Sequence, residues 1–204
     1  MHKYQWVEQG TSLHEAEKAI ILIHGRGAPP EDILGLADYF DTQNTYVAAP
    51  QATQYVWYPL SFLAPREQNQ PWLNSALENI ERLILHIENH IPAQKIYIMG
   101  FSQGACLSAE VASRNARRYA GVGIFTGGLI GESVDPKQYN GDFAGTPVYI
   151  TNGDKDPHIP LQRTHDTVTQ ISQMGAQVTF DIFPDRPHTI LMEEINKARS
   201  LFGL

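Results

Sequence analysis

One pentapeptide combines a nucleophilic side chain with two flanking glycines. Gly100-Phe101-Ser102-Gln103-Gly104 follows the apolar run 96–99 and precedes a stretch with helical spacing. A serine on a sharp strand-to-helix turn has strained backbone angles, and small flanking residues let the strand and the helix approach closely. The turn would expose the Ser102 hydroxyl and place the Gln103 amide at a helix N-terminus, where it can donate to a developing oxyanion. The pattern predicts a serine nucleophile, with an ordinary helix N-cap as the alternative.

A serine nucleophile requires a general base and an acid that orients the base. Ligands of doubly wound sheets bind at the carboxyl ends of the strands, so we expect both partners in loops that follow strands. Asp156 follows the apolar run 147–151, and His188 follows the run 177–183. The chain order Ser, Asp, His is that of α/β-hydrolases and differs from both common serine protease orders. Asp154 is an alternative acid, for which we expect hydrogen bonds to backbone amides of its turn.

Other histidines are alternatives to this base or support the site. His158 lies in the same loop as the candidate acid, and we expect it at the mouth of the site. His165 shares a helical stripe with apolar residues, which favours a hydrogen-bonded core histidine. His24 precedes the loop Gly25-Arg26-Gly27, and we expect it to support this loop by hydrogen bonding. The Arg26 amide is the candidate second oxyanion donor.

The elements that must position these residues follow from hydrophobic spacing. Short apolar runs alternate with stretches of helical periodicity, which predicts an α/β fold with a mostly parallel, doubly wound sheet and helices on both faces. The predicted strands are 19–23, 46–49, 95–99, 121–126, 147–151 and 177–183, and the predicted helices are 31–40, 72–91, 103–115, 161–174 and 189–202. The irregular segment 50–71 is too short for a large helical lid, so we expect a minimal lid at the rim of a pocket.

Composition narrows the class of protein. The chain has 204 residues, 42% hydrophobic content and a net charge of −7. This length predicts a single domain over residues 1–204, and the negative charge argues against nucleic acid and stable membrane association. The N-terminal residues include no apolar run of a targeting segment. The single cysteine, Cys106, excludes an internal disulfide and fits a cytoplasmic protein.

The sequence predicts neither a metal nor an organic cofactor. His86 and His90 are four residues apart in a predicted helix, but the flanking residues do not form a zinc-protease motif, so a solvated helix flank is the preferred interpretation. No glycine-rich phosphate loop is present.

Four motifs in this order resemble the phospholipase/carboxylesterase family of small α/β-hydrolases, which includes bacterial carboxylesterases and acyl-protein thioesterases. They are the segments 22–27, 100–105 and 153–160 and the C-terminal His188, while 125–130 is similar to the loop that lines the acyl pocket of this family. The resemblance implies an α/β-hydrolase fold in which Ser102 is the nucleophile, His188 the base and Asp156 its partner. It also implies an oxyanion hole formed by the amides of Arg26 and Gln103, a small-molecule ester substrate and the capacity to form a homodimer.

The expected reaction is hydrolysis of short- to medium-chain carboxylic esters through an acyl-enzyme. We expect Trp57, Tyr58, Leu129 and Ile159 to bind substrate, with a place in the core as the alternative. The pocket is favoured for Leu129 and Ile159, because both follow strand ends. Lysophospholipase or acyl-thioesterase activity with the same residues is an alternative. A dienelactone-hydrolase-like enzyme, a peroxidation activity and a catalytically silent binding module are less favoured.

Overall fold

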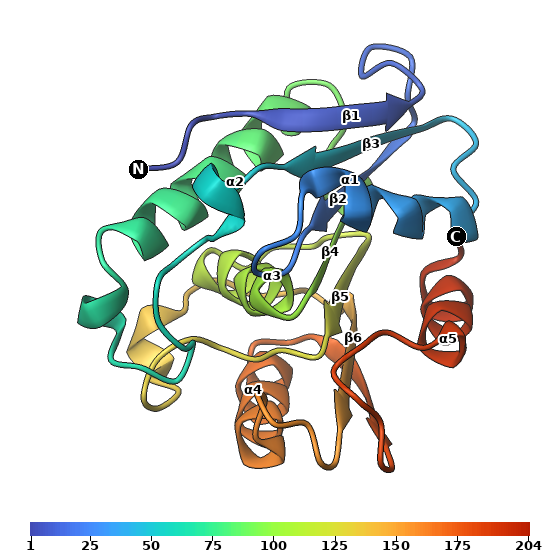
Figure 1. The fold of residues 1–204 in the computed structure, drawn as a ribbon. Helices are drawn as coiled ribbons and strands as arrows, with labels where there is room; N and C mark the ends of the chain where they lie inside the picture. Colours follow the sequence, from blue (N-terminus) through green and yellow to red (C-terminus); the bar gives the residue numbers. More distant parts are fainter.

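Seven strands form one sheet in the computed structural model, which describes residues 1–204 (Figure 1). The strand order is β1-β3-β2-β4-β5-β6-β7. All neighbouring strands are parallel except β1, which runs antiparallel to β3 at one edge. The bounds are β1 Trp6–Gly10, β2 Lys18–Ile23, β3 Thr45–Pro50, β4 Ile96–Phe101, β5 Gly121–Phe125, β6 Pro147–Gly153 and β7 Gln177–Phe183.

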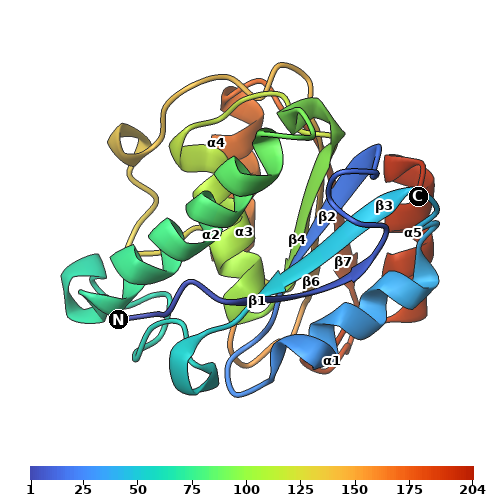
Figure 2. The ribbon, with the colours of Figure 1, turned by 90° about the horizontal axis from the view of Figure 1, so that it is seen from above.

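Helices cover both faces of this sheet, as Figure 2 shows. One face carries α2 (Trp72–Glu88), α3 (Gln103–Arg114) and α4 (Leu161–Gln173), and the other carries α1 (Pro30–Leu34) and α5 (Met192–Phe202). The expected α/β-hydrolase fold with a doubly wound, mostly parallel sheet is therefore confirmed.

The two faces bury two separate apolar clusters. In β2, the side chains of Ile21 and Ile23 belong to the larger cluster with α2 and α3, whereas Ile20 and Leu22 belong to the cluster with α1 and α5. All four side chains are buried. A strand buried on both faces needs apolar residues at every position, which explains why this one forms a continuous apolar run.

The predicted elements differ from the structure mainly at edges and ends. The strand β1 is absent from the prediction because an exposed edge strand has few apolar residues, and its pairing depends on β3, which is distant in sequence. The predicted helix 31–40 divides at Gly35 into α1 and a 3-10 turn, Gly35–Tyr39, because glycine is a poor helix former. The strand β4 continues through Phe101 because it pairs with β5 up to Phe125.

The segment between β3 and α2 contains two 3-10 turns, Thr53–Tyr55 and Arg66–Asn69, and no α-helix. Its second half is tied to α3 by Glu110, whose carboxylate accepts hydrogen bonds from the Arg66 guanidinium and the Ile130 amide. The Glu110 side chain has no exposed surface. None of the helices is both long and apolar enough to cross a lipid bilayer.

Candidate active site

Ser102 occupies a strained turn between β4 and α3. Its backbone angles are φ 55° and ψ −117°, a region that non-glycine residues rarely adopt. A Cβ on Gly100 would lie 2.4 Å from the Gly104 carbonyl oxygen, and a Cβ on Gly104 would lie 2.0 Å from the Ile23 carbonyl oxygen. Both flanking positions therefore require glycine, and the close approach that they allow is what presents Ser102 above the strand ends.

Three side chains from three different loops form a continuous hydrogen-bonded series. His188, in the loop after β7, has Nε2 at 2.8 Å from Ser102 Oγ and Nδ1 at 2.7 Å from Asp156 Oδ2. Asp156, in the loop after β6, also accepts from the amides of His158 and Ile159. Burial alone would raise the pKa of the Asp156 carboxyl, but the hydrogen bonds from His188 and from these two amides outweigh burial and lower it.

An ionised Asp156 selects one tautomer of the imidazole. Its carboxylate only accepts hydrogen bonds, so His188 Nδ1 must donate to it. Nε2 then carries the lone pair and accepts the Ser102 hydroxyl hydrogen. This arrangement can remove a proton from Ser102 and stabilise the imidazolium that results.

The residues considered as alternatives to Asp156 and His188 do not take part in this hydrogen-bonded series. Asp154 accepts from the amide of Asp185 and so connects the loops that follow β6 and β7, rather than bonding within its own turn as expected. His158 is exposed at the cavity and contacts the His188 ring edge-on, with 4.8 Å between ring centroids. The expectation of a core histidine at His165 is wrong, because this side chain is exposed on α4.

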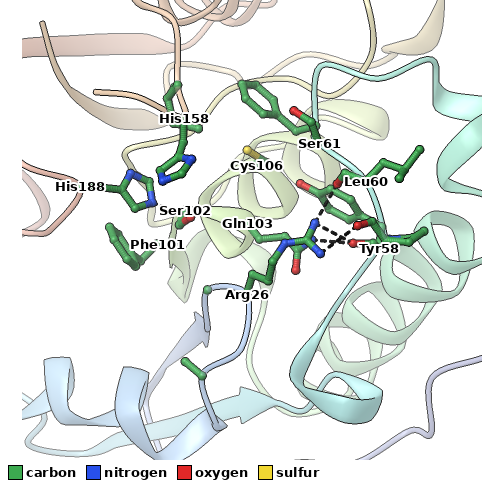
Figure 3. A pocket seen from close by; sticks show the side chains of 15 residues that line it. Arg26, Tyr58, Leu60, Ser61, Phe101, Ser102, Gln103, Cys106, His158 and His188 are labelled. Atoms are coloured by element: carbon green, nitrogen blue, oxygen red, sulfur yellow. Dashed lines mark hydrogen bonds between the residues drawn. The ribbon is translucent and has the colours of Figure 1, made fainter. Parts of the chain in front are cut away.

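The two backbone amides expected to form an oxyanion hole have no acceptor within the chain. Gln103 is the first residue of α3, and N–H groups in a first turn have no acceptor within the helix. The Arg26 amide donates to no acceptor of the chain. The side chains of both residues instead bind the segment across the cavity: Arg26 donates to the carbonyls of Tyr58, Pro59 and Leu60, and Gln103 Nε2 donates to that of Tyr58 (Figure 3).

His24 supports the Arg26 loop from within the core, as expected. Its Nδ1 donates to the Gly25 carbonyl and its Nε2 accepts from the Ala52 amide. Burial lowers the pKa of His24, which keeps the ring in the neutral form that this pattern needs. Trp57 stacks on the His24 ring and donates from Nε1 to the His24 carbonyl.

These groups face a cavity of about 580 Å³ (Figure 3). The catalytic candidates Ser102 and His188 lie at one side with Phe101 and His158, and the segment 58–62 forms the opposite side. Cys106 lies between them, one helical turn after Ser102. Burial raises the pKa of the Cys106 thiol to about 12, so the thiol is neutral at ordinary pH.

Two of the four predicted pocket residues are placed differently. Tyr58 and Ile159 line the cavity, whereas Trp57 and Leu129 do not. Trp57 is fully buried against His24, and Leu129 is fully buried with its amide and carbonyl bonded to Thr167 and Arg163 of α4. For both residues, packing of the loop backbone directs the side chain into the core instead of the cavity.

Arg186 is a residue of the site that sequence reasoning missed. Its guanidinium is buried and donates to Glu194 of α5 and to the hydroxyl of Thr126, which follows β5. It lies two residues before His188, so these contacts hold the loop that carries the imidazole. An arginine between an aspartate and a proline gives no sequence signal of burial, because charged side chains are usually exposed.

No group of three or more His, Cys, Asp or Glu side chains is arranged to hold a metal ion. His86 is exposed on α2 and His90 is exposed in the turn after this helix, which agrees with the interpretation of a solvated flank.

The fold and this site together define a serine hydrolase of the α/β-hydrolase class. Residues 3–202 match the phospholipase/carboxylesterase family, and the chain belongs to that family. A solved phospholipase/carboxylesterase from Dyadobacter fermentans is 44% identical and superposes with a TM-score of 0.97, over 100% of this chain and 98% of that one.

More distant relatives share the family or the fold. Acyl-protein thioesterase 1 of Debaryomyces hansenii is 31% identical over 136 residues, which are 65% of this chain and 58% of that protein. The carboxylesterase of Bacillus cereus is 18% identical with a TM-score of 0.79, over 98% of this chain and 93% of that one, which is a similarity of fold alone. The chain is thus an esterase-type hydrolase.

Proposed function

We propose that this protein hydrolyses short- to medium-chain carboxylic esters through an acyl-enzyme on Ser102. The observation that carries the proposal is the series of hydrogen bonds from Ser102 Oγ through His188 to Asp156, at 2.8 and 2.7 Å, beside a cavity of about 580 Å³. Family membership supports the same reaction type.

In the acylation step, Ser102 Oγ attacks the ester carbonyl carbon while its proton passes to His188 Nε2. The carbonyl oxygen becomes an oxyanion and accepts hydrogen bonds from the amides of Arg26 and Gln103. When the tetrahedral intermediate collapses, the C–O bond to the alcohol breaks and His188 returns the proton to the departing oxygen. Asp156 stabilises the imidazolium throughout.

In the deacylation step, water attacks the acyl carbon and gives its proton to His188. Collapse of the second intermediate breaks the bond to Ser102 Oγ, which regains the proton, and the carboxylic acid leaves. Each charge that develops is thus met by a group that the fold already holds in place, and this preorganisation is the main source of rate enhancement in such sites.

The cavity supports acyl groups of modest length. Phe62, Ile159 and the Cys106 thiol line it, and each further methylene of substrate gains about 0.8 kcal/mol only while apolar wall remains to cover it. We therefore expect kcat/KM to rise from acetate to about butyrate or hexanoate and then to fall. The segment 50–71 has no helix that could open on a lipid aggregate, so we expect no rate increase on micelles.

Thioester hydrolysis is the second candidate, because a 31% identical relative is an acyl-protein thioesterase. The same residues would act on an acyl thioester, whose leaving group is a thiol.

The test measures kcat/KM on p-nitrophenyl esters from acetate to palmitate and on acyl thioesters of equal chain lengths. Ser102→Ala is the matched negative variant, for which we expect a loss on the order of 10⁶-fold in kcat with an unchanged fold. Ser113→Ala is the control, since Ser113 lies buried at the far end of α3. A preference for palmitoyl esters or thioesters would favour the second candidate, and turnover by Ser102→Ala equal to the wild type would disprove the assigned nucleophile.

A further inference from the structure

We propose that the Gln103 side chain positions the oxyanion hole, because it ties the start of α3 to a bridging segment, residues 55–60, that also holds the loop of Arg26. This inference rests on the proposed function, in which the backbone amides of Arg26 and Gln103 bind the oxyanion. It assigns a positioning role to their side chains, which take no direct part in that reaction.

The Gln103 side chain binds two successive residues of the bridging segment. Its Oε1 accepts from the Trp57 amide at 3.0 Å, and its Nε2 donates to the Tyr58 carbonyl at 2.9 Å. The side chain is buried, so no water competes for these groups and the loss of either bond would leave a buried polar group unpaired. The two bonds therefore fix the start of α3 against the backbone of the bridging segment.

The same segment binds the loop that follows β2. The Gly27 amide donates to the Tyr55 carbonyl at 2.7 Å, and Trp57 Nε1 donates to the His24 carbonyl at 3.0 Å. These bonds lie on either side of Arg26 in the loop. The peptide unit that carries the proposed oxyanion donor is thus held between two attachments to the bridging segment.

The Tyr58 carbonyl is the point where the attachments of the two loops meet. It accepts from Arg26 Nη2 and from Gln103 Nε2, each at 2.9 Å (Figure 3). The Arg26 guanidinium also donates to the next two carbonyls, those of Pro59 and Leu60. One peptide oxygen therefore joins the side chains of both residues whose amides are the proposed oxyanion donors.

Backbone strain at the start of the bridging segment supports a functional role. Gln54 and Tyr55 both have positive φ, 54° and 61°, a region that non-glycine residues rarely adopt. Such strain persists only where the surrounding structure enforces it, and it is frequent at functional sites. Here the strained turn ends in the carbonyl that the Gly27 amide binds.

Direct contact between the two loops does not replace this bridge. The loops pack together at Gly104, where a Cβ would meet the carbonyls of Ile23 and His24. No backbone hydrogen bond joins residues 24–27 to residues 102–104. Packing limits how close the loops lie, whereas hydrogen bonds also fix direction, and an oxyanion hole requires two amides that point at one oxygen.

The first experiment uses Gln103→Met, which has a similar volume, keeps the backbone amide and removes both bonds to the bridging segment. We expect kcat on p-nitrophenyl butyrate to fall about 10- to 100-fold, because a slightly displaced donor costs that much. KM should change less than about threefold, since the lost interaction belongs to the transition state.

Two ketone inhibitors of equal chain length separate positioning from general damage. A trifluoromethyl ketone adds to the Ser102 hydroxyl and forms an oxyanion, whereas the corresponding methyl ketone binds without forming one. We expect Gln103→Met to weaken the inhibition constant of the first by about the same factor as kcat, as for a transition-state analogue, and to leave that of the second unchanged. An unchanged ratio of the two constants overturns the inference.

A double-mutant cycle tests the bridge itself. Arg26→Met should lower kcat about tenfold in the wild type but less than about threefold in the Gln103→Met background, where the bridging segment no longer reaches α3. Arg26→Lys should retain part of the activity, because an ammonium can donate to the same carbonyls. Losses that multiply in the double variant would mean that each side chain acts on its own loop, which overturns the inference. If Gln103→Met does not fold, the ketone ratio in Arg26→Met decides in the same way.

Asn69→Ala is the matched control. Asn69 is buried and binds the far end of the segment, accepting from the Leu60 amide and donating to the Ser61 carbonyl, but it makes no hydrogen bond to either loop. This variant should lose stability in urea and keep the wild-type ketone ratio, and a change as large as in Gln103→Met would assign the effect to general loosening and overturn the inference. If the wild type hydrolyses no ester faster than Ser102→Ala, the proposed function itself fails and this inference fails with it.

Discussion

The guanidinium of Arg186 and the carboxylate of Glu194 form an ion pair that is buried on both sides. Their closest atoms, Nη1 and Oε1, are 2.6 Å apart, and the two side chains are 1% and 0% exposed. Glu194 also accepts from the Leu191 amide at the start of α5. The pair therefore joins the His188 loop to a helix that packs on the opposite face of the sheet from α3, and we infer that Arg186 is a positioning residue for the imidazole.

Removal of one partner should separate stability from positioning. Arg186→Leu leaves Glu194 buried without a counter-charge, so we expect a loss of about 3–5 kcal/mol of unfolding free energy. The double variant Arg186→Leu with Glu194→Leu should regain most of that stability, because an apolar pair can replace a buried ion pair. Its kcat should stay about 100-fold low with little change in KM, since a slightly displaced catalytic group costs about that much. Urea unfolding measures the stability of the two variants, and steady-state kinetics measure their kcat and KM. Recovery of kcat together with stability in the double variant would show that Arg186 has a purely structural role.

The two aspartates of the loop after β6 should differ sharply in kinetics. Asp156→Asn places an amide against His188 Nδ1 and favours the wrong tautomer, so we expect kcat to fall on the order of 10⁴-fold. Asp154→Asn removes the charge of an exposed acceptor for the Asp185 amide, and kcat should change by less than about threefold. Equal losses in the two variants, or the reverse order, would contradict the assignment of Asp156 as the partner of the base.

Asp156 should also contribute a pH-dependent part of stability. Its pKa is lowered in the folded protein, so folding favours the ionised form. The contribution is therefore complete above the pKa of the unfolded chain, about 3.9, and is lost as the pH falls through the lower folded value. The difference in unfolding free energy between wild type and Asp156→Asn, measured in urea from pH 3 to pH 7, should be constant near neutrality and shrink below about pH 5. A difference that widens toward low pH would mean that the carboxyl is protonated in the folded state.

The Cys106 thiol should be unreactive in the folded protein although it lines the cavity. With a pKa of about 12, only about one molecule in 10⁴ carries a thiolate at pH 8, and the thiolate is the reactive form. We expect negligible alkylation by iodoacetamide at pH 8 and complete alkylation in denaturing urea, with mass spectrometry as the readout. Rapid native modification would argue for a reactive thiol instead of a packing residue.

Local pattern was sufficient to predict the elements and the positions of the candidate reacting groups. Strands buried on both faces form continuous apolar runs, which is why β2, β4 and β6 could be predicted from the sequence. Gly100 of the Gly-x-Ser-x-Gly turn is required for a local reason, because a side chain there would meet the Gly104 carbonyl, whereas Gly104 is required by its contact with the Ile23 carbonyl of β2. The apolar runs and the contact at Gly100 depend on neighbours in sequence, and the chain alone determined them.

Only the tertiary structure decided which side chains face one another. Asp154 and Asp156 are two residues apart, and the fold of the loop brings the second against His188 and sends the first to Asp185. Trp57 and Tyr58 are adjacent, yet one packs on His24 and the other lines the cavity. The burial of Arg186 depends on Glu194 in another element. Side-chain direction and the burial of charge are set by packing between segments distant in sequence, and no periodicity in the sequence encodes that packing.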